Sequence, residues 1–299
     1  MTEKFGVIAL VGAPNSGKST LSNTLLGQKV TITSPKVQTT RNVIRAILVE
    51  EDTQLVLLDT PGVFIPRHDK ILERVIVKSA WQGIRSADFV CLLIDANRGL
   101  DSENLRILQE LKKDGFNPAV IINKVDSIQK EKLLIISSKL IENEVTDIFM
   151  ISALKNDGIK ELKEFMLNKC QEAPWQFHED DITDVPIKSM AAEITREKLF
   201  RYLNQEIPYS VTVLTDSFEH SGDKITINQS ILVTKDSQKG IILGKKGTLL
   251  KKIGSEARKD IAEAAGCRVS LFLFVKVKKD WMNHVENYEI FDVEKLPNN

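Results

Sequence analysis

A short stretch near the N-terminus combines residue types that suit phosphate binding. Residues 12–19 read Gly-Ala-Pro-Asn-Ser-Gly-Lys-Ser and match the pattern G-x-x-x-x-G-K-[ST], between an apolar run and a helical pattern. Glycine lets the backbone curl so that N–H groups point at phosphate oxygens, and the following helix start adds positive potential. Lys18 is predicted to contact the β- and γ-phosphates, and the Ser19 hydroxyl to bind Mg²⁺. The residues expected to contact the nucleotide here are Gly12, Asn15, Ser16, Gly17, Lys18, Ser19 and Thr20.

A second motif, Asp59-Thr60-Pro61-Gly62, ends an apolar strand pattern. Asp59 is expected to hold Mg²⁺ through water, and the Gly62 N–H is expected to sense the γ-phosphate. An aspartate at the end of a strand is often only a turn or cap residue. Its place after the phosphate motif, in the order that a GTPase requires, favours the metal role.

Guanine recognition is predicted by Asn123-Lys124-Val125-Asp126, which follows another strand pattern. A carboxylate at Asp126 can accept hydrogen bonds from both the ring N–H and the exocyclic amine of guanine, whereas adenine offers no such pair. Ser152-Ala153 resembles a further guanine-contacting loop, in which a backbone N–H meets the guanine oxygen. Open parallel sheets bind ligands at the carboxyl ends of their strands, so these motifs are expected to meet at one edge.

A polar stretch at 30–42 is expected to switch with the nucleotide, and Thr40 is predicted to close over Mg²⁺, with Thr39 as the alternative. Val63 follows Gly62, where Ras-like enzymes carry a glutamine that orients the attacking water. Valine neither donates nor accepts a hydrogen bond, so intrinsic hydrolysis should be slow or depend on another group. Asn15 is a candidate K⁺ ligand, since such an ion could supply stabilising charge beside the phosphates. The predicted catalytic residues are Lys18, Thr40 and Gly62.

A second informative stretch lies near the C-terminus. Residues 241–247 read Ile-Ile-Leu-Gly-Lys-Lys-Gly, and a G-x-x-G loop between two helical elements is typical of a KH domain, which clamps single-stranded nucleic acid. From Lys235 to Lys279 there are twelve basic and four acidic residues, a net charge of +8 in a chain whose total is zero. Basic residues around a phosphate-clamping loop indicate an RNA surface rather than a solvated helix face. The predicted RNA-binding residues are Gly240, Gly244, Lys245, Lys246, Gly247 and Lys251.

The elements that must position these residues divide into two patterns. Apolar runs alternate with amphipathic segments as far as about residue 170, which predicts a mostly parallel sheet with helices on both faces, here a P-loop NTPase of the Ras-like kind. The stretch 43–58 is the exception and predicts an antiparallel hairpin. A helix at 191–204, strands at 210–216 and 224–233, a Gly/Lys-rich loop, a helix at 248–265 and a strand at 268–277 predict an α+β type II KH domain. The predicted domains are 1–172 and 191–299, joined by a linker at 173–190.

Bulk composition excludes several other classes. The 299 residues are 42% hydrophobic and 27% charged, which is ordinary for a globular protein, and no apolar run approaches the ~20 residues of a membrane span. Three scattered cysteines form neither a disulfide framework nor a metal set. The first residues show no signal-peptide pattern. A cytoplasmic monomer that does not bind DNA is expected.

The combination of motifs resembles the Era GTPase family. The resemblance is carried by the phosphate loop, Gln38-Thr39-Thr40-Arg41, D-T-P-G, N-K-V-D, the segment 190–213 and the G-x-x-G loop, and it covers essentially the whole chain. It implies slow GTP hydrolysis, GTP/GDP and Mg²⁺ as cofactors, and binding to the 3′ end of small-subunit (16S) ribosomal RNA. It also implies a role in maturation of the 30S ribosomal subunit and peripheral contact with the inner membrane. Asn15 matches the potassium-binding asparagine of the family's relatives.

Two other functions fit parts of the sequence. A GTPase coupled to RNA modification would need further catalytic residues, often a C-terminal cysteine, and the acidic stretch 286–299 contains none. A nucleotide-binding scaffold without turnover is the second, and a single-turnover GTP assay in K⁺ against Na⁺ distinguishes it from a working switch.

Overall fold

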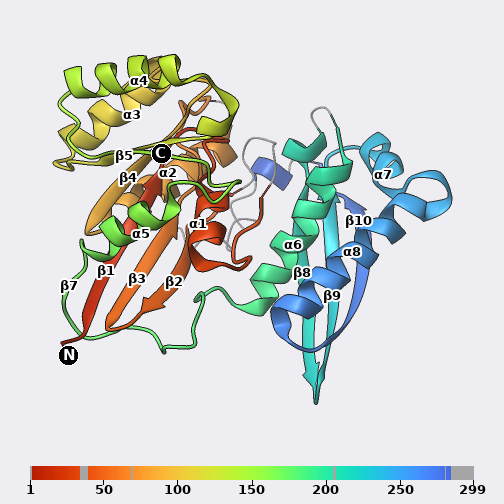
Figure 1. Cartoon of the computed structure of the whole chain (residues 1–299). Helices are drawn as coiled ribbons and strands as arrows, with labels where there is room; N and C mark the ends of the chain where they lie inside the picture. Colours follow the sequence, from red (N-terminus) through yellow and green to blue (C-terminus); the bar gives the residue numbers. More distant parts are fainter. Residues whose placement is uncertain (1, 34–39, 69, 205–206, 280, 284–299) are drawn as a thin grey trace. The chain divides into compact units, whose positions relative to one another are not determined.

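The computed structural model describes residues 2–33, 40–68, 70–204, 207–279 and 281–283. Its residues fall into two compact units, Met1–Asp184 and Val185–Asn299, which are described separately below. Figure 1 labels most of the helices and strands of both units.

A mostly parallel sheet forms the centre of the first unit, as predicted. The strand order is β2-β3-β1-β4-β5-β6, with the short β7 pairing antiparallel to β1. β2 and β3 are antiparallel to each other, which confirms the predicted hairpin, and the other neighbours on this path are parallel. The strands are β1 (Lys4–Val11), β2 (Ile44–Glu50), β3 (Thr53–Asp59), β4 (Phe89–Asp95), β5 (Ala119–Asn123), β6 (Ile148–Ile151) and β7 (Gln171–Glu172).

Helices cover the two faces of this sheet because its strands are apolar on both sides. Ala9 and Val11 of β1 belong to a core cluster that also includes buried residues of α2, α3 and α4, such as Ile84, Leu108 and Leu140. Alternate strand residues face the other way, and α1 and α5 pack there against β3 and each other. The helices are α1 (Lys18–Leu26), α2 (Ile71–Arg85), α3 (Ser102–Lys113), α4 (Lys130–Glu142) and α5 (Ile159–Leu167).

The predicted linker at 173–190 needs correction, because its first part is built into the first unit. Gln54 in β3 is fully buried and donates to Phe177 O at 2.8 Å, while its Oε1 accepts from the N–H groups of Gln176 and Phe177 at 3.0 Å each. Farther along, Arg45 in β2 forms an ion pair with Asp184 at 2.6 Å. Residues 173–184 are therefore a strap along the β2–β3 hairpin, and only a few residues separate it from the next helix.

The second unit has the element order of the predicted type II KH domain. Its sheet runs β10-β9-β8, with β8 and β9 antiparallel and β9 and β10 parallel, and α6 and α8 pack together beside it. The first helix begins four residues earlier than predicted, and the helical element expected before the G-x-x-G loop is α7, which occupies the first part of the stretch predicted as a Gly/Lys-rich loop. The elements are α6 (Ile187–Tyr202), β8 (Thr212–Ser221), β9 (Lys224–Val233), α7 (Asp236–Leu243), α8 (Thr248–Ala265) and β10 (Arg268–Val277). Within the described residues of both units, no helix has the length and apolar character needed to cross a membrane.

Candidate functional site

The phosphate motif forms the connection between β1 and α1. Lys18, the first residue of α1, is only 6% exposed, and its Nζ donates to Gly12 O at 3.0 Å and Ala13 O at 3.1 Å. Burial lowers the pKa of Lys18 to about 8, although the nearby Asp59 charge acts in the opposite direction. A partly desolvated ammonium group inside a loop is stabilised by a bound anion, which suits the predicted phosphate contact.

The phosphate loop lies directly against the end of β5. A Cβ atom on Gly17, whose φ is +101°, would lie 2.2 Å from Asn123 Nδ2, so this approach requires glycine. Asn123 Nδ2 donates to Ser16 O at 2.9 Å, and its Oδ1 accepts from the N–H groups of Lys124 at 2.8 Å and Ala153 at 3.0 Å. One buried amide side chain therefore joins three of the loops predicted to contact the nucleotide.

The guanine-reading residues lie at the same edge. Asp126 is exposed, as a side chain that meets a base must be, whereas Ser152 and Ala153 are buried. The Ala153 N–H donates to Asn123, and the Ser152 N–H donates to Asp157 O at 3.0 Å. Both N–H groups thus hold the loop in place here, and the predicted contact of one of them with the guanine oxygen stays a prediction.

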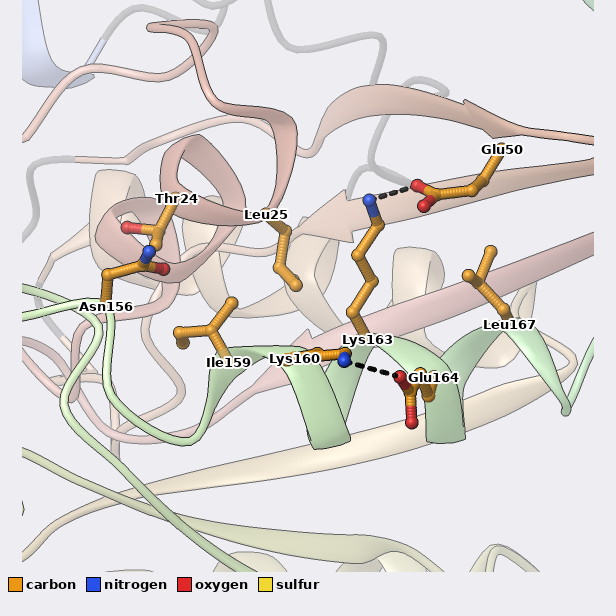
Figure 2. Close-up of a pocket in the computed structure, with 9 residues that line it drawn as sticks. All are labelled: Thr24, Leu25, Glu50, Asn156, Ile159, Lys160, Lys163, Glu164 and Leu167. Atoms are coloured by element: carbon orange, nitrogen blue, oxygen red, sulfur yellow. Dashed lines mark ion pairs between the residues drawn. The ribbon is translucent and has the colours of Figure 1, made fainter.

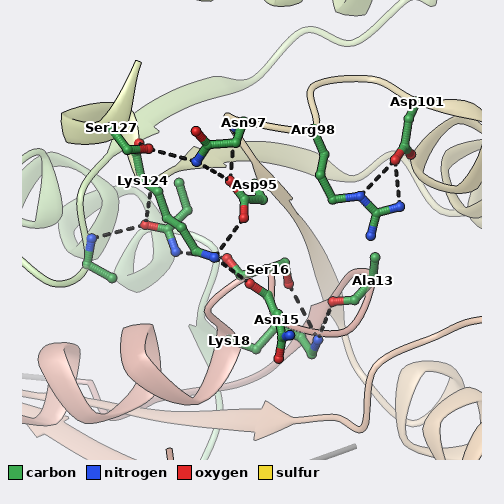
Figure 3. A network of polar contacts seen from close by, with 12 residues as sticks. Ala13, Asn15, Ser16, Lys18, Asp95, Asn97, Arg98, Asp101, Lys124 and Ser127 are labelled. Carbon is green, nitrogen blue, oxygen red and sulfur yellow. Dashed lines mark hydrogen bonds and ion pairs between the residues drawn. The ribbon is translucent and has the colours of Figure 1, made fainter. Parts of the chain in front are cut away.

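Lys124 connects the guanine motif to the phosphate loop. Its Nζ donates to Asn15 O at 2.7 Å and forms an ion pair with Asp95 Oδ2 at 2.7 Å, as Figure 3 shows. Asp95 is the last residue of β4. Burial alone would raise the pKa of Asp95, but hydrogen bonds from Lys124 and Asn97, together with the Lys124 charge, hold it below its usual range.

A set of hard oxygen ligands surrounds the start of α1. The Asp59 carboxylate is fully buried and accepts no hydrogen bond from the described residues, and Ser19 Oγ lies 2.9 Å from Thr40 Oγ1. Burial raises the pKa of Asp59 to about 6, while the nearby hydroxyls of Ser19 and Thr31 and the Lys18 charge lower it. An orphaned carboxylate beside two hydroxyls fits Mg²⁺, which prefers oxygen ligands and carries the missing positive charge.

The loop after Asp59 packs against the phosphate loop. A Cβ on Gly62 would lie 2.8 Å from Pro14 Cα, and the Val63 N–H donates to Gly12 O at 3.1 Å. The Val63 side chain is buried in the core and does not face the site. Position 63 therefore offers no group to the attacking water. Thr39, the alternative to Thr40, lies outside the described residues.

The remaining predicted nucleotide residues are also placed by the same loop and helix. Asn15 is exposed with a φ of 64°, and Thr20 lies in the first turn of α1, where its carbonyl accepts from Thr24 Oγ1 at 2.8 Å. A separate hollow of about 350 Å³ lies between α1, α5 and the end of β2. Figure 2 shows it bordered by the ion pairs Glu50–Lys163 and Lys160–Glu164, and no predicted site residue lines it.

The G-x-x-G loop of the second unit joins α7 to α8. Gly244 has a φ of +70°, and a Cβ there would lie 2.7 Å from Leu249 Cβ, so a larger residue would disturb the start of α8. The side chains of Lys245, Lys246 and Lys251 are exposed, and no ion pair involves them within the described residues. Gly240 is exposed in α7, and Gly247 is the residue before α8.

Two of the four acidic residues in the basic stretch are held by α6. Asp260 forms an ion pair with Lys198, and Glu256 with Arg201 at 3.7 Å. Two of the twelve basic residues are paired in the same way, Arg268 with Asp223 and Lys276 with Asp216, so the net charge of the stretch is unchanged by these contacts. The exposed side chains of Lys245, Lys246 and Lys251 supply positive charge at and beside the G-x-x-G loop itself.

Comparison with known proteins identifies both units. A family model described as "50S ribosome-binding GTPase" matches residues 7–124, and a KH domain model matches residues 206–282. GTPase Era of Afipia carboxidovorans is 46% identical over 293 residues, which cover 97% of this chain and 94% of the relative. GTPase Era of Rickettsia akari is 44% identical over 288 residues, covering 96% and 97%.

The chain belongs to the GTPase Era family.

Two solved structures of the family have the same fold. A crystal structure of Era in complex with MgGDPNP and nucleotides 1506–1542 of 16S ribosomal RNA aligns with a TM-score of 0.92 at 36% identity, over 97% of this chain and 99% of that one. A variant of Aquifex aeolicus Era bound to GDP and AlF₄⁻ also aligns with a TM-score of 0.92, at 37% identity and the same coverage. The predicted family is thereby confirmed over nearly the full length.

Sequence reasoning missed several residues of this Era family site. Asp95 ends β4 and Asn97 lies two residues after it, and β4 is the one central parallel strand whose end carries no recognised motif in the sequence analysis. Thr31 lies near Asp59 and donates to Ser19 O at 3.1 Å, while Asn23 accepts from the Thr31 N–H at 2.9 Å. The position of Asp95 at a strand's carboxyl end was the available indication, since each neighbouring strand end carries a site residue.

Proposed function

We propose that the chain is a molecular switch that binds GTP, hydrolyses it slowly and binds 16S ribosomal RNA through its KH unit, so assisting assembly of the 30S subunit. The observation that carries the nucleotide half is the buried Asn123 side chain, which bonds the phosphate loop, the guanine motif and the Ser152–Ala153 loop at one sheet edge. Family membership supports the same reading. The solved relative bound to MgGDPNP supports GTP, GDP and Mg²⁺ as the ligands.

Each residue of the site has a separate task in this proposal. Lys18 and the loop N–H groups hold the phosphates, and Asp126 selects guanine by accepting from its two N–H donors. Ser19, Thr40 and Asp59 would hold Mg²⁺, which neutralises phosphate charge when bound. Thr40 and Gly62 lie on the segments expected to rearrange when the γ-phosphate leaves, which makes them the switch.

Slow hydrolysis is the expected consequence of the valine at position 63. Its side chain is in the core, so the attacking water must be oriented by another group. A K⁺ ion near Asn15 is part of this proposal, because a cation there could stabilise charge that develops on the phosphates. Asn15 lies in the phosphate loop itself, its side chain is exposed, and its backbone has a left-handed conformation with a φ of 64°. These features support a K⁺ site beside the phosphates.

The RNA half of the proposal rests on the G-x-x-G loop. Its exposed lysines Lys245 and Lys246 lie between two glycines, in a unit that matches the KH domain model. The solved relative with nucleotides 1506–1542 of 16S rRNA supports the 3′ end as the target. We further propose that the chain acts as a cytoplasmic monomer, that it does not bind DNA, and that it contacts the inner membrane peripherally.

Two assays on the full chain test this function. Single-turnover GTP hydrolysis is measured in K⁺ and in Na⁺: product formation that is faster in K⁺ is expected, absence of product contradicts turnover, and equal rates contradict the K⁺ site. Fluorescence anisotropy then compares a 16S 3′-end fragment with a scrambled fragment of equal length. Tighter binding of the native fragment is expected, and equal affinity contradicts the rRNA target.

A further inference from the structure

A small polar cluster binds both the side-chain ammonium and the backbone carbonyl of Lys124 in the guanine motif. The cluster consists of Asp95, which is the last residue of β4, Asn97 in the connection that follows, and Ser127 after β5, and Figure 3 shows its contacts. Asp95 Oδ2 binds the Lys124 ammonium at 2.7 Å, and Ser127 Oγ donates to the Lys124 carbonyl at 2.6 Å. The side chain and the backbone of one lysine are thus fixed by the same group of residues.

Asn97 makes this cluster a single unit. Its Nδ2 donates both to Asp95 Oδ1 at 2.9 Å and to Ser127 Oγ at 2.7 Å, and its backbone N–H donates to Asp95 Oδ1 at 2.9 Å. A shift of Asp95 would therefore disturb both the ion pair to the Lys124 ammonium and, through Asn97, the position of Ser127, which donates to the Lys124 carbonyl. The Asp95 side chain is 15% exposed and that of Lys124 is 37% exposed, so their ion pair is partly shielded from water.

The lysine so held links two backbone positions that are unfavourable for residues with a side chain. Lys124 has a φ of 65° and Asn15 a φ of 64°, both in the left-handed region. The Lys124 ammonium donates to the Asn15 carbonyl at 2.7 Å, so one hydrogen bond joins the two. Such conformations persist only where surrounding contacts determine them, and the Asp95 cluster supplies contacts of this kind at Lys124.

We propose that Asp95 is a positioning residue for guanine-nucleotide binding, which holds Lys124 against the phosphate loop and so keeps the guanine motif and the phosphate loop in their binding arrangement. This inference rests on the proposed nucleotide site. Asp95 does not itself reach the base edge that Asp126 reads in that proposal. Its loss should therefore weaken the binding of any nucleotide that uses both loops, without changing which purine is preferred.

The experiment measures release of fluorescent methylanthraniloyl-GDP from the full chain. Asp95→Asn keeps the size of the side chain and removes its charge, and release is expected to become about tenfold faster, because a charge-assisted hydrogen bond is lost. Ser127→Ala, at an exposed position, tests the other anchor and is expected to speed release about threefold. Asp101→Asn is the matched control, since Asp101 pairs with Arg98 in the same connection without touching Lys124. Its release rate should stay within about twofold of wild type.

A double-mutant cycle separates positioning from general stability. If Asp95 acts through Lys124, Asp95→Asn adds nothing to the release rate of a Lys124→Ala chain. The ratio of GDP to IDP affinity should also be the same in Asp95→Asn as in wild type, because IDP lacks only the exocyclic amine that Asp126 reads. Additive effects in the cycle, or a changed GDP to IDP ratio, would overturn the positioning role.

Failure of the inference and failure of the nucleotide site give different results. Wild-type chain that does not bind the fluorescent GDP contradicts the proposed function itself. Wild-type chain that binds it, with Asp95→Asn and Ser127→Ala both releasing it at the wild-type rate, contradicts only the role of Asp95.

Discussion

Asp59 illustrates a residue kept for function at a cost to the ligand-free protein. Its carboxylate is fully buried without a hydrogen bond from the described residues, and burial raises its pKa from 3.8 to about 6. Above that pKa the folded chain must carry a buried negative charge, and Lys18 and the nearby hydroxyls offset only part of the cost of removing it from water. Mg²⁺ is the partner that would remove the rest of this cost, since it prefers oxygen ligands and carries positive charge.

Replacing Asp59 with asparagine should stabilise the first unit at neutral pH in the absence of nucleotide, by about 1–3 kcal/mol, because a buried charge with incomplete compensation is removed. A raised carboxyl pKa contributes stability that is complete below about 3.8 and is lost as pH rises through about 6. The gain from Asp59→Asn should therefore be largest at pH 7.5 and smaller at pH 5.0. Urea unfolding at the two pH values measures it.

The same variant should lose the Mg²⁺-dependent part of GTP affinity, which titration with and without Mg²⁺ detects. A variant that is less stable than wild type at both pH values would contradict the assignment of Asp59 as a buried charge that costs stability.

Residues with a fixed spacing could be predicted from the sequence, and residues without one could not. Lys18, Asp59 and Asn123 were each found from a motif that follows a strand. Asp95 was not, because a single aspartate after an apolar run is as consistent with an ordinary turn. Its role became visible only when the structure placed it 2.7 Å from the ammonium of Lys124, 29 residues away in sequence.

At the scale of elements, the G-x-x-G connection is predicted to supply RNA affinity through charge. Lys245→Ala/Lys246→Ala should weaken binding of the 16S fragment at low salt and make the negative slope of log affinity against log salt shallower by about 1.4, since about 0.7 counterions are released per single-strand phosphate contact. Anisotropy titrations at several salt concentrations measure the slope. The control is Lys130→Ala/Lys132→Ala, which removes two lysines of α4 in the first unit.

An unchanged slope in the Lys245→Ala/Lys246→Ala variant would contradict the proposal that these lysines contact RNA phosphates. Gly244→Asp is a stronger change and should abolish RNA binding. It also places a Cβ against Leu249, so its thermal unfolding must be compared with wild type before the loss is assigned to RNA contacts.

The strap at 173–184 gives a second prediction at this scale. Gln54→Ala should destabilise the first unit by about 2–4 kcal/mol, because Phe177 O and the N–H groups of Gln176 and Phe177 lose their partners. Hydrogen exchange should show both amides exchanging faster than in wild type. Unchanged protection of these amides would mean that the strap is held by other contacts.

The positions of helices and strands were predictable where the apolar periodicity is strong. They were not predictable where contacts between residues far apart in sequence determine the structure. The parallel strands and α3 follow their apolar patterns closely. The acidic, aromatic and proline-containing composition of the strap lacks periodicity and therefore predicts a linker. The contacts that hold the strap come from a buried glutamine in β3, 122 and 123 positions earlier, and such distant contacts give no signal in the sequence of the strap. The early start of α6 was missed for a similar reason, since Ile187 and Met190 follow a proline that suits the start of a helix as well as a linker.

At the scale of the whole molecule, the two units have separate cores, and this predicts two unfolding transitions. Buried residues of the first unit cluster around β1 and β4, and those of the second around β9 and α8. GDP with Mg²⁺ at 100 times its dissociation constant adds about 2.7 kcal/mol to the unit that binds it, which raises that transition by roughly 5–10 °C. Differential scanning calorimetry measures both transitions.

Only the transition of the first unit should move with GDP, and Lys18→Ala should abolish the shift. A rise of both transitions by the same amount would contradict independent units. The two-unit organisation itself was predictable, because the alternation of strands and helices changes near residue 173, but the boundary was not, since the strap continues the first unit to Asp184.

Guanine selectivity is the most direct test of the whole account. Calorimetric titration of the nucleotide-free chain with GDP and ADP, each with Mg²⁺, should show GDP binding at least about 10³-fold more tightly, because adenine leaves the Asp126 carboxylate without its two donors. Asp126→Asn should reduce that preference and favour XDP, whose base carries a carbonyl where guanine has the amine. Equal affinity for GDP and ADP in the wild-type chain, or an unchanged GDP affinity in Asp126→Asn, would contradict the account.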